Sequence, residues 1–443
     1  MGEEVEDDGL EDYWLWETQT LFGRHRNATG NLTLDACADF PTQHLKRVQV
    51  VLKVGAADDA ARTEAQLNSV IKCISNVLIV SDDDHAYGPY QAHDVLASLP
   101  PDSYMNPGDY AVYNKQKNSS HEELVQGHDG WKIDKYKFLP EIEQAREVAP
   151  QAEWYVFLES DTYIFWDNLF RLLGQYNSSL PWYMGSPSPG KEYKDKRDGH
   201  KKKVWFANGG PGFVLSSAAA EALVHLERNK IGMQSPRITD QYKRQIREDC
   251  CGDSILGWAL HDKPDVHITG LWPMFTPHPL HDIPFGQKYW CEPVISLHKT
   301  ATEDFVPLWE WEQSRDRTKG PLLYSHLLPH LLPSPSDTRE NWDAAYQSGY
   351  NYRSPHAAHD SLASCADACA ADADCWQYTY HAAHCWMSRD LFRGHAKQPD
   401  GAHDEEGRKY VSGWDEVKIA NWTRGNECEE QGRWVKGSTV RIF

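Results

Sequence analysis

The chain has 443 residues, which is too long for one ordinary hydrophobic core and predicts two or three domains. Hydrophobic residues make up 40% and charged residues 25%, a composition typical of globular proteins and not of disordered ones. Acidic residues number 65 against 45 lysines and arginines, giving a formal net charge of −20. Nucleic acid is therefore excluded as an expected partner, because such binding depends on positive charge that neutralises phosphates.

Several features predict residence in the secretory lumen. No run of about 20 apolar residues is present, and the start lacks the charged and apolar parts of a signal peptide. The ten cysteines are even in number, and five Asn-x-Ser/Thr sequons accompany them. We therefore expect an exported protein whose membrane anchor, if it has one, is absent from this chain; the alternative is a cytosolic protein with chance sequons. The sequons are Asn27, Asn31, Asn118, Asn177 and Asn421.

The pattern divides the chain into four parts. Residues 1–44 are expected to form an acidic, glycosylatable lead-in, and residues 45–330 the main domain. Prolines and serines at 331–340 predict a linker, and residues 341–443 follow as a small cysteine-rich domain with a C-terminal tail.

The main domain begins with a strand–helix–strand pattern. Residues 46–54 are rich in β-branched side chains, residues 58–74 have helical periodicity, and residues 76–80 form a second apolar run. Further helices are predicted at 131–149, at 167–175 and from Ser217. This order predicts an α/β fold with a mostly parallel central sheet.

An acidic pair follows another buried strand. Residues 154–158 are apolar throughout and run directly into Glu159-Ser160-Asp161. Ligands of α/β sheets bind at the carboxyl ends of the strands, where two carboxylates can hold a divalent cation against a nucleotide diphosphate. The alternative is a solvated strand end without a metal.

Two further segments carry chemical signals. Gly209, Gly210 and Gly212 remove side chains where the backbone must approach a ligand or take a positive φ, unless they simply form a tight hairpin. The acidic segment 248–253 contains Cys250 and Cys251, and we expect each to pair with a distant cysteine because adjacent residues cannot easily pair across one normal peptide. Between these motifs, basic residues at 191–203 predict a charged loop, either mobile or a lid over an anionic nucleotide.

Three motifs in order resemble the fringe and core 1 β1,3-galactosyltransferase family (glycosyltransferase family 31). Residues 154–164 (WYVFLESDTYI) resemble its D-D-D-T-Y-V segment, with Glu159 where the family has aspartate. Residues 206–216 (FANGGPGFVLS) resemble A-S-G-G-A-G-Y-V-L-S, and residues 253–257 (DSILG) resemble D-x-x-x-G. The resemblance covers about residues 45–300 and implies a GT-A-type fold and an inverting transferase that uses a UDP-sugar donor and Mn²⁺.

The resemblance also implies roles for single residues. Asp161, helped by Glu159 and His298, would hold Mn²⁺, with His278 and His281 as alternative ligands. Asp253 would be the catalytic base. Asp249 is the alternative, but the glycine that follows it is one residue too close to match the D-x-x-x-G segment. Lys135 would face the donor phosphates, or else lie on a solvated helix face. The glycines Gly209, Gly210 and Gly212 would lie beside the donor.

Four close cysteines mark the C-terminal domain. Cys365, Cys369, Cys375 and Cys385 resemble the pattern of a PAN/apple domain, a small disulfide-bonded α+β fold. The resemblance implies the pairs Cys365–Cys385 and Cys369–Cys375, although four cysteines allow three connectivities. A zinc site that also uses His381 and His384 is the alternative.

The sequence as a whole therefore predicts a UDP-sugar-dependent β1,3-glycosyltransferase of the Golgi lumen, a type II membrane protein when full length, or a secreted one. Galactose is the favoured sugar and N-acetylglucosamine the next, and the acceptor is a glycan or glycoprotein. The apple-like domain would bind a protein or a sugar. The alternatives are a glycosidase, which needs two facing carboxylates and no metal, and a non-catalytic sugar-binding or adhesion protein built on a decayed transferase.

Overall fold

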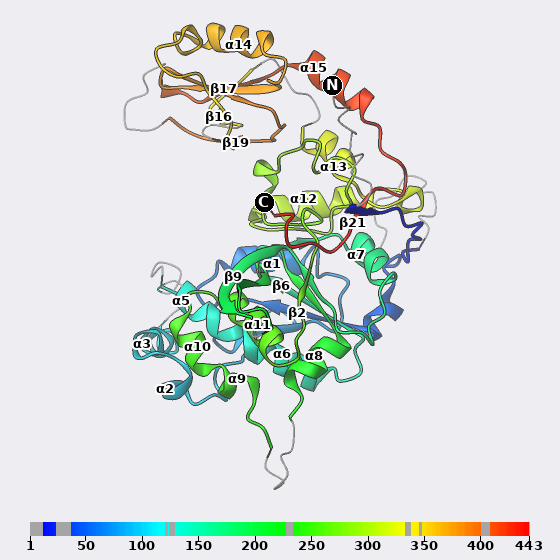
Figure 1. Cartoon of the computed structure of the whole chain (residues 1–443), viewed down its shortest axis with the longest axis vertical. Helices are drawn as coiled ribbons and strands as arrows, with labels where there is room; N and C mark the ends of the chain where they lie inside the picture. The colour runs from blue at the N-terminus through cyan, green and yellow to red at the C-terminus, as the bar shows by residue number, and fades with distance from the viewer. Residues whose placement is uncertain are drawn as a thin grey trace.

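A computed structural model describes residues 12–23, 37–119, 123, 129–195, 197–226, 234–332, 338–344, 348–399 and 408–442. A large eight-stranded sheet flanked by helices forms the main body, and a smaller sheet with its own helix lies at one end (Figure 1). The strand order in the large sheet is β12-β8-β11-β6-β2-β3-β5-β4. These strands are β2 (Val48–Lys53), β3 (Leu78–Ser81), β4 (His85–Tyr87), β5 (Tyr90–Asp94), β6 (Trp154–Glu159), β8 (Tyr183–Gly185), β11 (Phe213–Ser216) and β12 (Ile268–Gly270).

The large sheet is mixed. Strand β2 pairs in parallel with both β3 and β6, and β3–β5 and β8–β12 are also parallel. Strand β11 runs antiparallel to β6 and β8, and β4 runs antiparallel to β5. The predicted parallel unit is therefore present at the centre, while antiparallel pairings occur on both sides of it.

The central strand is buried on both faces. Val50 and Leu52 of β2 belong to one hydrophobic core, and Val51 between them belongs to a second. Helices α1 (Ala60–Leu67) and α7 (Trp166–Leu173) supply residues to the first core. Helices α6 (Phe138–Val148), α8 (Ser217–Val224) and α11 (Gly252–Asp262) supply residues to the second. Because side chains alternate across a strand, an all-apolar strand needs helices on both faces.

The predicted helices are present with different bounds. The 131–149 pattern forms α5 (Trp131–Asp134), a 3₁₀ turn at Lys135–Lys137 and then α6. The 58–74 pattern keeps its helix only to Leu67, and the chain then turns through Ile74. The remaining helices of the main body are α2 (Pro101–Tyr104), α3 (Pro107–Gln116), α9 (Ile238–Gln241), α10 (Lys243–Glu248), α12 (Thr302–Gln313) and α13 (Tyr324–Leu331).

The basic segment 191–203 is not the loop that we expected. Strands β9 (Pro187–Lys194) and β10 (Lys201–Ala207) pair as an antiparallel hairpin. At its turn the Asp195 carboxylate accepts hydrogen bonds from Lys202 Nζ at 2.6 Å and from the Arg197 backbone amide at 2.8 Å. A count of basic residues does not show the effect of Asp195, whose carboxylate neutralises part of the basic cluster and fixes the turn.

The C-terminal part has its own sheet, with strand order β15-β20-β17-β18 and helix α14 (Leu362–Ala371) against it (Figure 1). Cys365 pairs with Cys385 and Cys369 with Cys375, so the expected pairing is confirmed and these cysteines hold no zinc. The other elements here are β15 (Arg339–Glu340), β16 (Trp342–Asp343), β17 (Gln377–His381), β18 (His384–Ser388), β19 (His395–Ala396), β20 (Val411–Trp414) and α15 (Glu416–Gly425).

The two ends of the described chain meet on the main body. Strand β1 (Tyr13–Trp14) of the expected lead-in pairs antiparallel with β21 (Trp434–Val435) of the tail. Trp434 is fully buried in the first core, and the Cys291–Cys428 disulfide joins the tail to the main body. The described start of the lead-in and the tail thus both belong structurally to the main body. The middle of the predicted linker, residues 333–337, lies outside the described residues.

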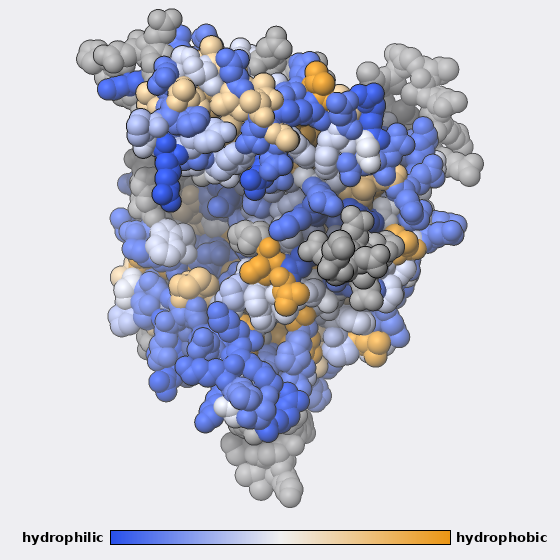
Figure 2. Space-filling view, turned by 45° about the horizontal axis from the view of Figure 1, so that its top comes forward, coloured by the Kyte–Doolittle hydropathy of each residue, from blue (hydrophilic) through white to orange (hydrophobic). Residues whose placement is uncertain are grey.

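The surface is largely hydrophilic on the face shown in Figure 2, with hydrophobic residues in small separate groups. Within the described ranges, no helix combines the length and apolar character needed to cross a membrane. The sequon asparagines Asn118, Asn177 and Asn421 are exposed, whereas Asn27 and Asn31 lie outside the described residues.

Candidate functional site

The acidic pair lies at the carboxyl end of β6. Glu159 is the last residue of that strand, and Asp161 stands in the turn before β7 (Tyr163–Ile164). The side-chain amide of Gln66 donates hydrogen bonds to the carbonyls of Glu159, at 3.0 Å, and Thr162, at 2.8 Å. A helix-borne side chain therefore fixes the backbone of the acidic turn.

His298 reaches the same turn from a distant segment. Strand β14 (Ser296–Leu297) pairs antiparallel with β7, and the Thr300 amide donates to the Asp161 carbonyl at 3.0 Å. This register puts His298 Nε2 3.6 Å from Asp161 Oδ1. Burial lowers the pKa of His298 despite the nearby carboxylate, which favours a neutral imidazole able to bind a metal.

Glu159, Asp161 and His298 together fit a divalent cation. One ligand atom from each lies within 4.8 Å of the others. Asp161 Oδ1 is buried and accepts no hydrogen bond from the described residues, so an oxygen is left for a ligand. Two carboxylates and an imidazole form a donor set that Mn²⁺ accepts.

Glu159 is shared with a buried lysine. Lys53 of β2 lies with its ammonium 3.0 Å from Glu159 Oε1 and 2.6 Å from Asp134 Oδ2. Burial raises the pKa of Glu159, and Lys53 opposes that rise. A cation at this site would therefore compete with Lys53 for the Glu159 carboxylate, whereas Asp161 is free of that competition.

The glycine motif makes room for these side chains. A Cβ on Gly210 would lie 2.1 Å from the His298 ring, and one on Gly209 would lie 2.9 Å from Glu159 Oε1. Gly212 has a φ of +78°, which favours glycine. The hydroxyl of Thr162 donates to the Gly210 carbonyl at 2.6 Å and joins the acidic turn to the glycine turn. The glycines are thus required by the packing of the acidic cluster.

Asp253 reaches the cluster through the glycine turn. It lies in the first turn of α11, where Oδ2 accepts from the Gly209 amide at 2.9 Å and Oδ1 from the Ser254 amide at 2.8 Å. A Cβ on Gly209 would meet Glu159 Oε1, so Asp253 and Glu159 both lie next to the glycine turn. Burial raises the pKa of Asp253, although the two amides oppose that rise. A buried carboxylate with a raised pKa is suited to general-base chemistry.

Glu159 and Asp161 also line a cavity of about 430 Å³. Its lining includes five carboxylates and three cationic side chains, so it favours a cation bound together with an anion over a bare anion. Arg62 lies here, with its guanidinium 3.7 Å from Asp161 Oδ2, and the indole of Trp131 on the rim is 69% exposed. The charged lining residues are Lys53, Asp58, Arg62, Asp82, Asp134, Lys137, Glu159 and Asp161.

Sequence reasoning missed Lys53, Arg62 and Trp131. Lys53 lies in the run 50–54, whose other members are apolar, and a buried ammonium needs carboxylate partners, but the run does not identify those partners. Lys135, the residue implied by the resemblance, does not line this cavity: its ammonium lies 3.3 Å from Asp109 and donates to the Asp249 carbonyl at 3.0 Å. The lysine that lies in the cavity two residues later is Lys137.

The alternative residues have other partners. The Asp249 carboxylate lies 3.0 Å from Lys191 of the hairpin, and its backbone carbonyl binds Lys135. His281 lies with its ring 4.6 Å from that of His395, and His278 packs at 6.2 Å against Tyr289. In the described part of the chain, none of these three joins the cluster of Glu159, Asp161 and His298.

The expectation for Cys250 and Cys251 was wrong. The two cysteines pair with each other, with Cα atoms 3.8 Å apart, the spacing of a trans peptide. Every other cysteine already has a distant partner, and the chain turns sharply here between α10 and α11. The bond stiffens the turn that leads directly into Asp253.

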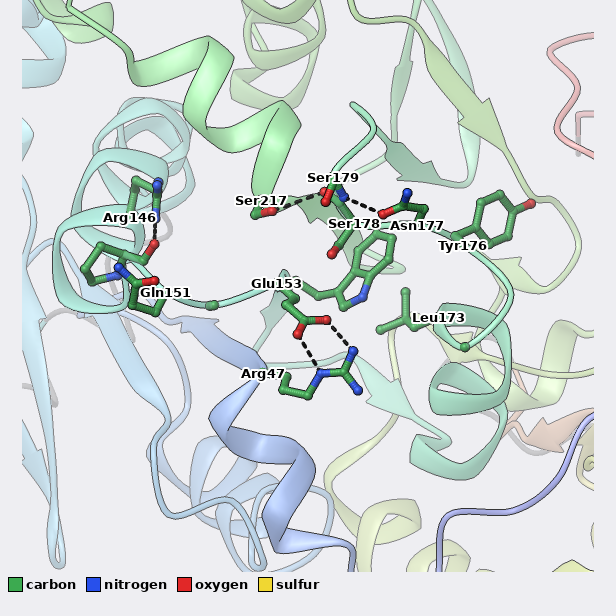
Figure 3. Close-up of a pocket in the computed structure, with 14 residues that line it drawn as sticks. Arg47, Arg146, Gln151, Glu153, Leu173, Tyr176, Asn177, Ser178, Ser179 and Ser217 are labelled. Carbon is green, nitrogen blue, oxygen red and sulfur yellow. Dashed lines mark hydrogen bonds and ion pairs between the residues drawn. The ribbon is translucent and has the colours of Figure 1, made fainter.

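Another hollow lies at the opposite ends of the same strands (Figure 3). The Arg47–Glu153 ion pair crosses it, and the sequon residue Asn177 lies on its wall. Glu153 precedes the first residue of β6 and Glu159 is the last, so the two hollows are about 20 Å apart along the strand. Its open polar wall carries no clustered acids or histidines, so we place the chemistry at Asp161.

Comparison with known proteins points to one class. Residues 111–270 match the Fringe-like family model. The fringe glycosyltransferase of Drosophila melanogaster is 35% identical over 72 residues, which cover 15% of this chain and 18% of that protein. β-1,3-N-acetylglucosaminyltransferase lunatic fringe of Bos taurus is 31% identical over 84 residues, or 18% of this chain and 22% of that protein. β-1,3-N-acetylglucosaminyltransferase radical fringe of Notophthalmus viridescens is 25% identical over 135 residues, or 28% of this chain and 33% of that protein.

The matched region contains the acidic turn, the glycine turn and Asp253, so this α/β body is similar to glycosyltransferases of the fringe type where its site lies. The fringe part of the expected resemblance is confirmed to that extent. The chain spans about a fifth to a third of the length of these relatives, so the activity of the whole protein is a matter for proposal. The core 1 and apple-domain resemblances stay predictions.

Proposed function

We propose that the main body is an inverting glycosyltransferase that moves a sugar from a UDP-sugar to an acceptor hydroxyl and forms a β1,3 linkage. One observation carries the proposal: the Asp253 carboxylate accepts from the amide of Gly209, where an added Cβ would meet Glu159, a member of the cluster with Asp161 and His298. A base held beside the acidic cluster and a cavity lined by that cluster suit a reaction in which an acceptor hydroxyl attacks the donor as the diphosphate leaves.

The donor would occupy the cavity of Lys53, Arg62 and Trp131. Its diphosphate would lie toward Asp161 and the Arg62 guanidinium, whose planar fork suits phosphate oxygens. The exposed indole of Trp131 offers a flat face on which a nucleobase or sugar ring can stack. Asp161, Glu159 and His298 would hold Mn²⁺, which when bound neutralises charge on the leaving diphosphate.

Asp253 would remove the proton from the attacking hydroxyl. Its Oδ2 is held by Gly209, so the carboxylate keeps a fixed orientation and has lone pairs left for the acceptor. Burial raises the pKa of Asp253, which strengthens its ionised form as a base. A single displacement needs no covalent enzyme intermediate, and the chain supplies one base for it.

Galactose and N-acetylglucosamine are the two sugars to compare. Galactose follows from the family resemblance, and N-acetylglucosamine from the names of two relatives. The acceptor would be a glycan or glycoprotein of the secretory lumen. The five disulfides and the exposed sequons support that compartment. The apple-like part would bind a protein or sugar partner.

The test is a panel of UDP-sugars with Mn²⁺, scored for transfer onto simple glycosides, with and without a chelator. We expect transfer that the chelator abolishes and that Asp161→Asn lacks. Hydrolysis of glycosides that is insensitive to the chelator would instead establish a glycosidase. Sugar binding without UDP release or transfer, under any divalent metal, would establish a decayed transferase that serves as a binding protein.

A further inference from the structure

A second group of metal-binding side chains lies at the far end of α11. His261 is in the last turn of that helix, and Asp265 and His267 follow in the segment that leads into β12. One ligand atom from each lies within 4.8 Å of the other two. Asp253 and His261 are eight residues apart on one helix, or about 12 Å, so this group is separate from the cation site at Asp161.

The backbone folds back to bring the three side chains together. The helix ends at Asp262, and Asp265 takes the left-handed conformation with a φ of 54°. The Val266 amide then donates to the Leu260 carbonyl at 2.9 Å, which returns the chain over the last helical turn. Aspartate tolerates this conformation better than most residues, so the sequence itself favours the reversal.

The distances suit one small cation. His267 Nε2 lies 3.1 Å from Asp265 Oδ1, and His261 Nδ1 lies 3.9 Å from the same oxygen. Tetrahedral zinc with bonds of about 2.0–2.1 Å places its ligand atoms roughly 3.3 Å apart. Small side-chain rotations therefore bring these three atoms to bonding positions around one ion.

The His261 imidazole has a nitrogen available for a metal. His261 Nδ1 is buried, and among the described residues it has no hydrogen-bond partner. Asp265 and His267 are exposed, with side chains 81% and 62% accessible, so an ion has a route from solvent.

We propose that His261, Asp265 and His267 form a zinc site on the outside of the main body. Two imidazoles and one carboxylate select Zn²⁺ over Mn²⁺ and Mg²⁺, which prefer oxygen ligands. A bound ion would join the end of α11 to the segment entering β12. The Tyr193 ring packs 4.6 Å from His261, so the ion would also stiffen the end of β9 next to the hairpin turn.

The test measures Zn²⁺ binding directly. The full chain is stripped of metal and titrated with Zn²⁺ in competition with a chromophoric chelator, first as the Asp161→Asn variant. We expect one bound Zn²⁺ in that background, because the proposed site does not use Asp161. In the same background, His267→Gln or Asp265→Asn should weaken binding about tenfold or more, as expected for loss of a ligand.

Two controls keep the result interpretable. His225→Gln changes another exposed histidine, just after the end of α8, and should leave the Zn²⁺ affinity unchanged. His267 and Asp265 are exposed, so their variants should keep the thermal unfolding of the metal-free protein, which is measured in parallel. The inference is overturned if the Asp161→Asn protein binds no Zn²⁺, or if both His267→Gln and Asp265→Asn bind it as well as their parent.

Discussion

Asp161 and Asp253 differ in what their carboxylate oxygens contact. Asp161 keeps one buried oxygen without a hydrogen bond among the described residues, as a metal ligand requires. Asp253 has both oxygens hydrogen-bonded to backbone amides, as an oriented base requires. The two carboxylates are thus suited to different tasks because of where the backbone amides point.

Replacing Asp161 with asparagine tests the first task. The change keeps the shape but removes the charge, so we expect the apparent Mn²⁺ affinity, read from the metal dependence of transfer, to fall about 10- to 100-fold or more. Asp374→Asn, an exposed change in the C-terminal part, is the matched control and should leave that affinity unchanged. An Asp161→Asn protein with the metal dependence of the wild type would remove Asp161 from the site.

The raised pKa of Asp253 predicts a pH dependence. The base must be ionised, and burial lifts its pKa above the ordinary 3.8, so kcat/KM should fall with decreasing pH through a limb above 3.8. Asp253→Glu should move this limb, whereas changes remote from the site should not. Tryptophan fluorescence, followed in parallel, separates the limb from acid unfolding. A profile that is flat down to pH 4 in folded protein would contradict the assignment.

The sequence predicted these residues unevenly. Asp161, Glu159 and His298 were accessible because acids at a strand end and a family-like order of motifs both pointed to them. Lys53 was not, because its role depends on Asp134, which is 81 residues away in the chain and reaches it only in the folded sheet. Single-residue roles that rest on such long-range pairs have no local signature.

At the scale of elements, the glycine turn between β10 and β11 is fitted to its neighbours. We predict that Gly210→Ala displaces His298, because the new methyl group would lie 2.1 Å from its ring. Transfer activity should fall about tenfold or more, with a loss of stability of about 1–3 kcal/mol from overpacking. Gly425→Ala is the matched control, since a Cβ there meets nothing within 4 Å. Equal activity in both variants would show that the His298 ring accommodates the added methyl group without being displaced.

Helix α6 contains a buried acid with an unusual pKa. Glu141 is 1% exposed, neither carboxylate oxygen has a hydrogen-bond partner among the described residues, and burial raises its pKa to about 8. The folded state therefore holds a proton that the unfolded state releases above its ordinary value of 4.5. Stability due to this group is greatest below pH 4.5 and declines as the pH rises toward 8.

Glu141→Gln tests that linkage. The variant should unfold like the wild type at pH 5 and be more stable by roughly 1–3 kcal/mol at pH 8, as judged by urea denaturation. Glu416→Gln, on the partly exposed first turn of α15, should show no such difference. If the two pH values gave the same difference between Glu141→Gln and wild type, the carboxyl would be ionised throughout.

Elements with strong periodicity were the easiest to predict. The strand at 154–158 and the helix through 131–149 were found as expected, within a few residues at the ends. The two C-terminal disulfides, which the family resemblance implied, were also found. The β9–β10 hairpin and the Cys250–Cys251 bond were missed. Both depend on how a turn closes, which composition and charge do not report.

On the scale of the whole molecule, the C-terminal tail contacts both the N-terminal strand β1 and the main body. Trp434 is fully buried in the first core, β21 pairs with β1, and Cys428 is bonded to Cys291. A division at the linker alone, as the sequence suggested, therefore separates segments that the fold unites. The tail leaves the C-terminal part and returns to cover the main body.

This arrangement predicts that the tail stabilises the main body. Trp434→Ala should lower the free energy of unfolding by about 3–5 kcal/mol, the usual cost of removing a buried aromatic side chain. Val440→Ala, six residues away and 90% exposed, should change it by less than about 0.5 kcal/mol. Similar effects of Trp434→Ala and Val440→Ala on urea unfolding would mean that the tail does not contribute to the stability of the main body.

The central claim is that the acidic turn and Asp253 work as one site in a sugar transfer. The most direct measurement is the turnover of Asp253→Asn with donor and Mn²⁺ saturating, in protein whose donor binding is measured alongside. The structure predicts unchanged donor binding and a turnover lower by about 10²–10⁴-fold, the usual contribution of a general base. Turnover near that of the wild type would contradict the claim.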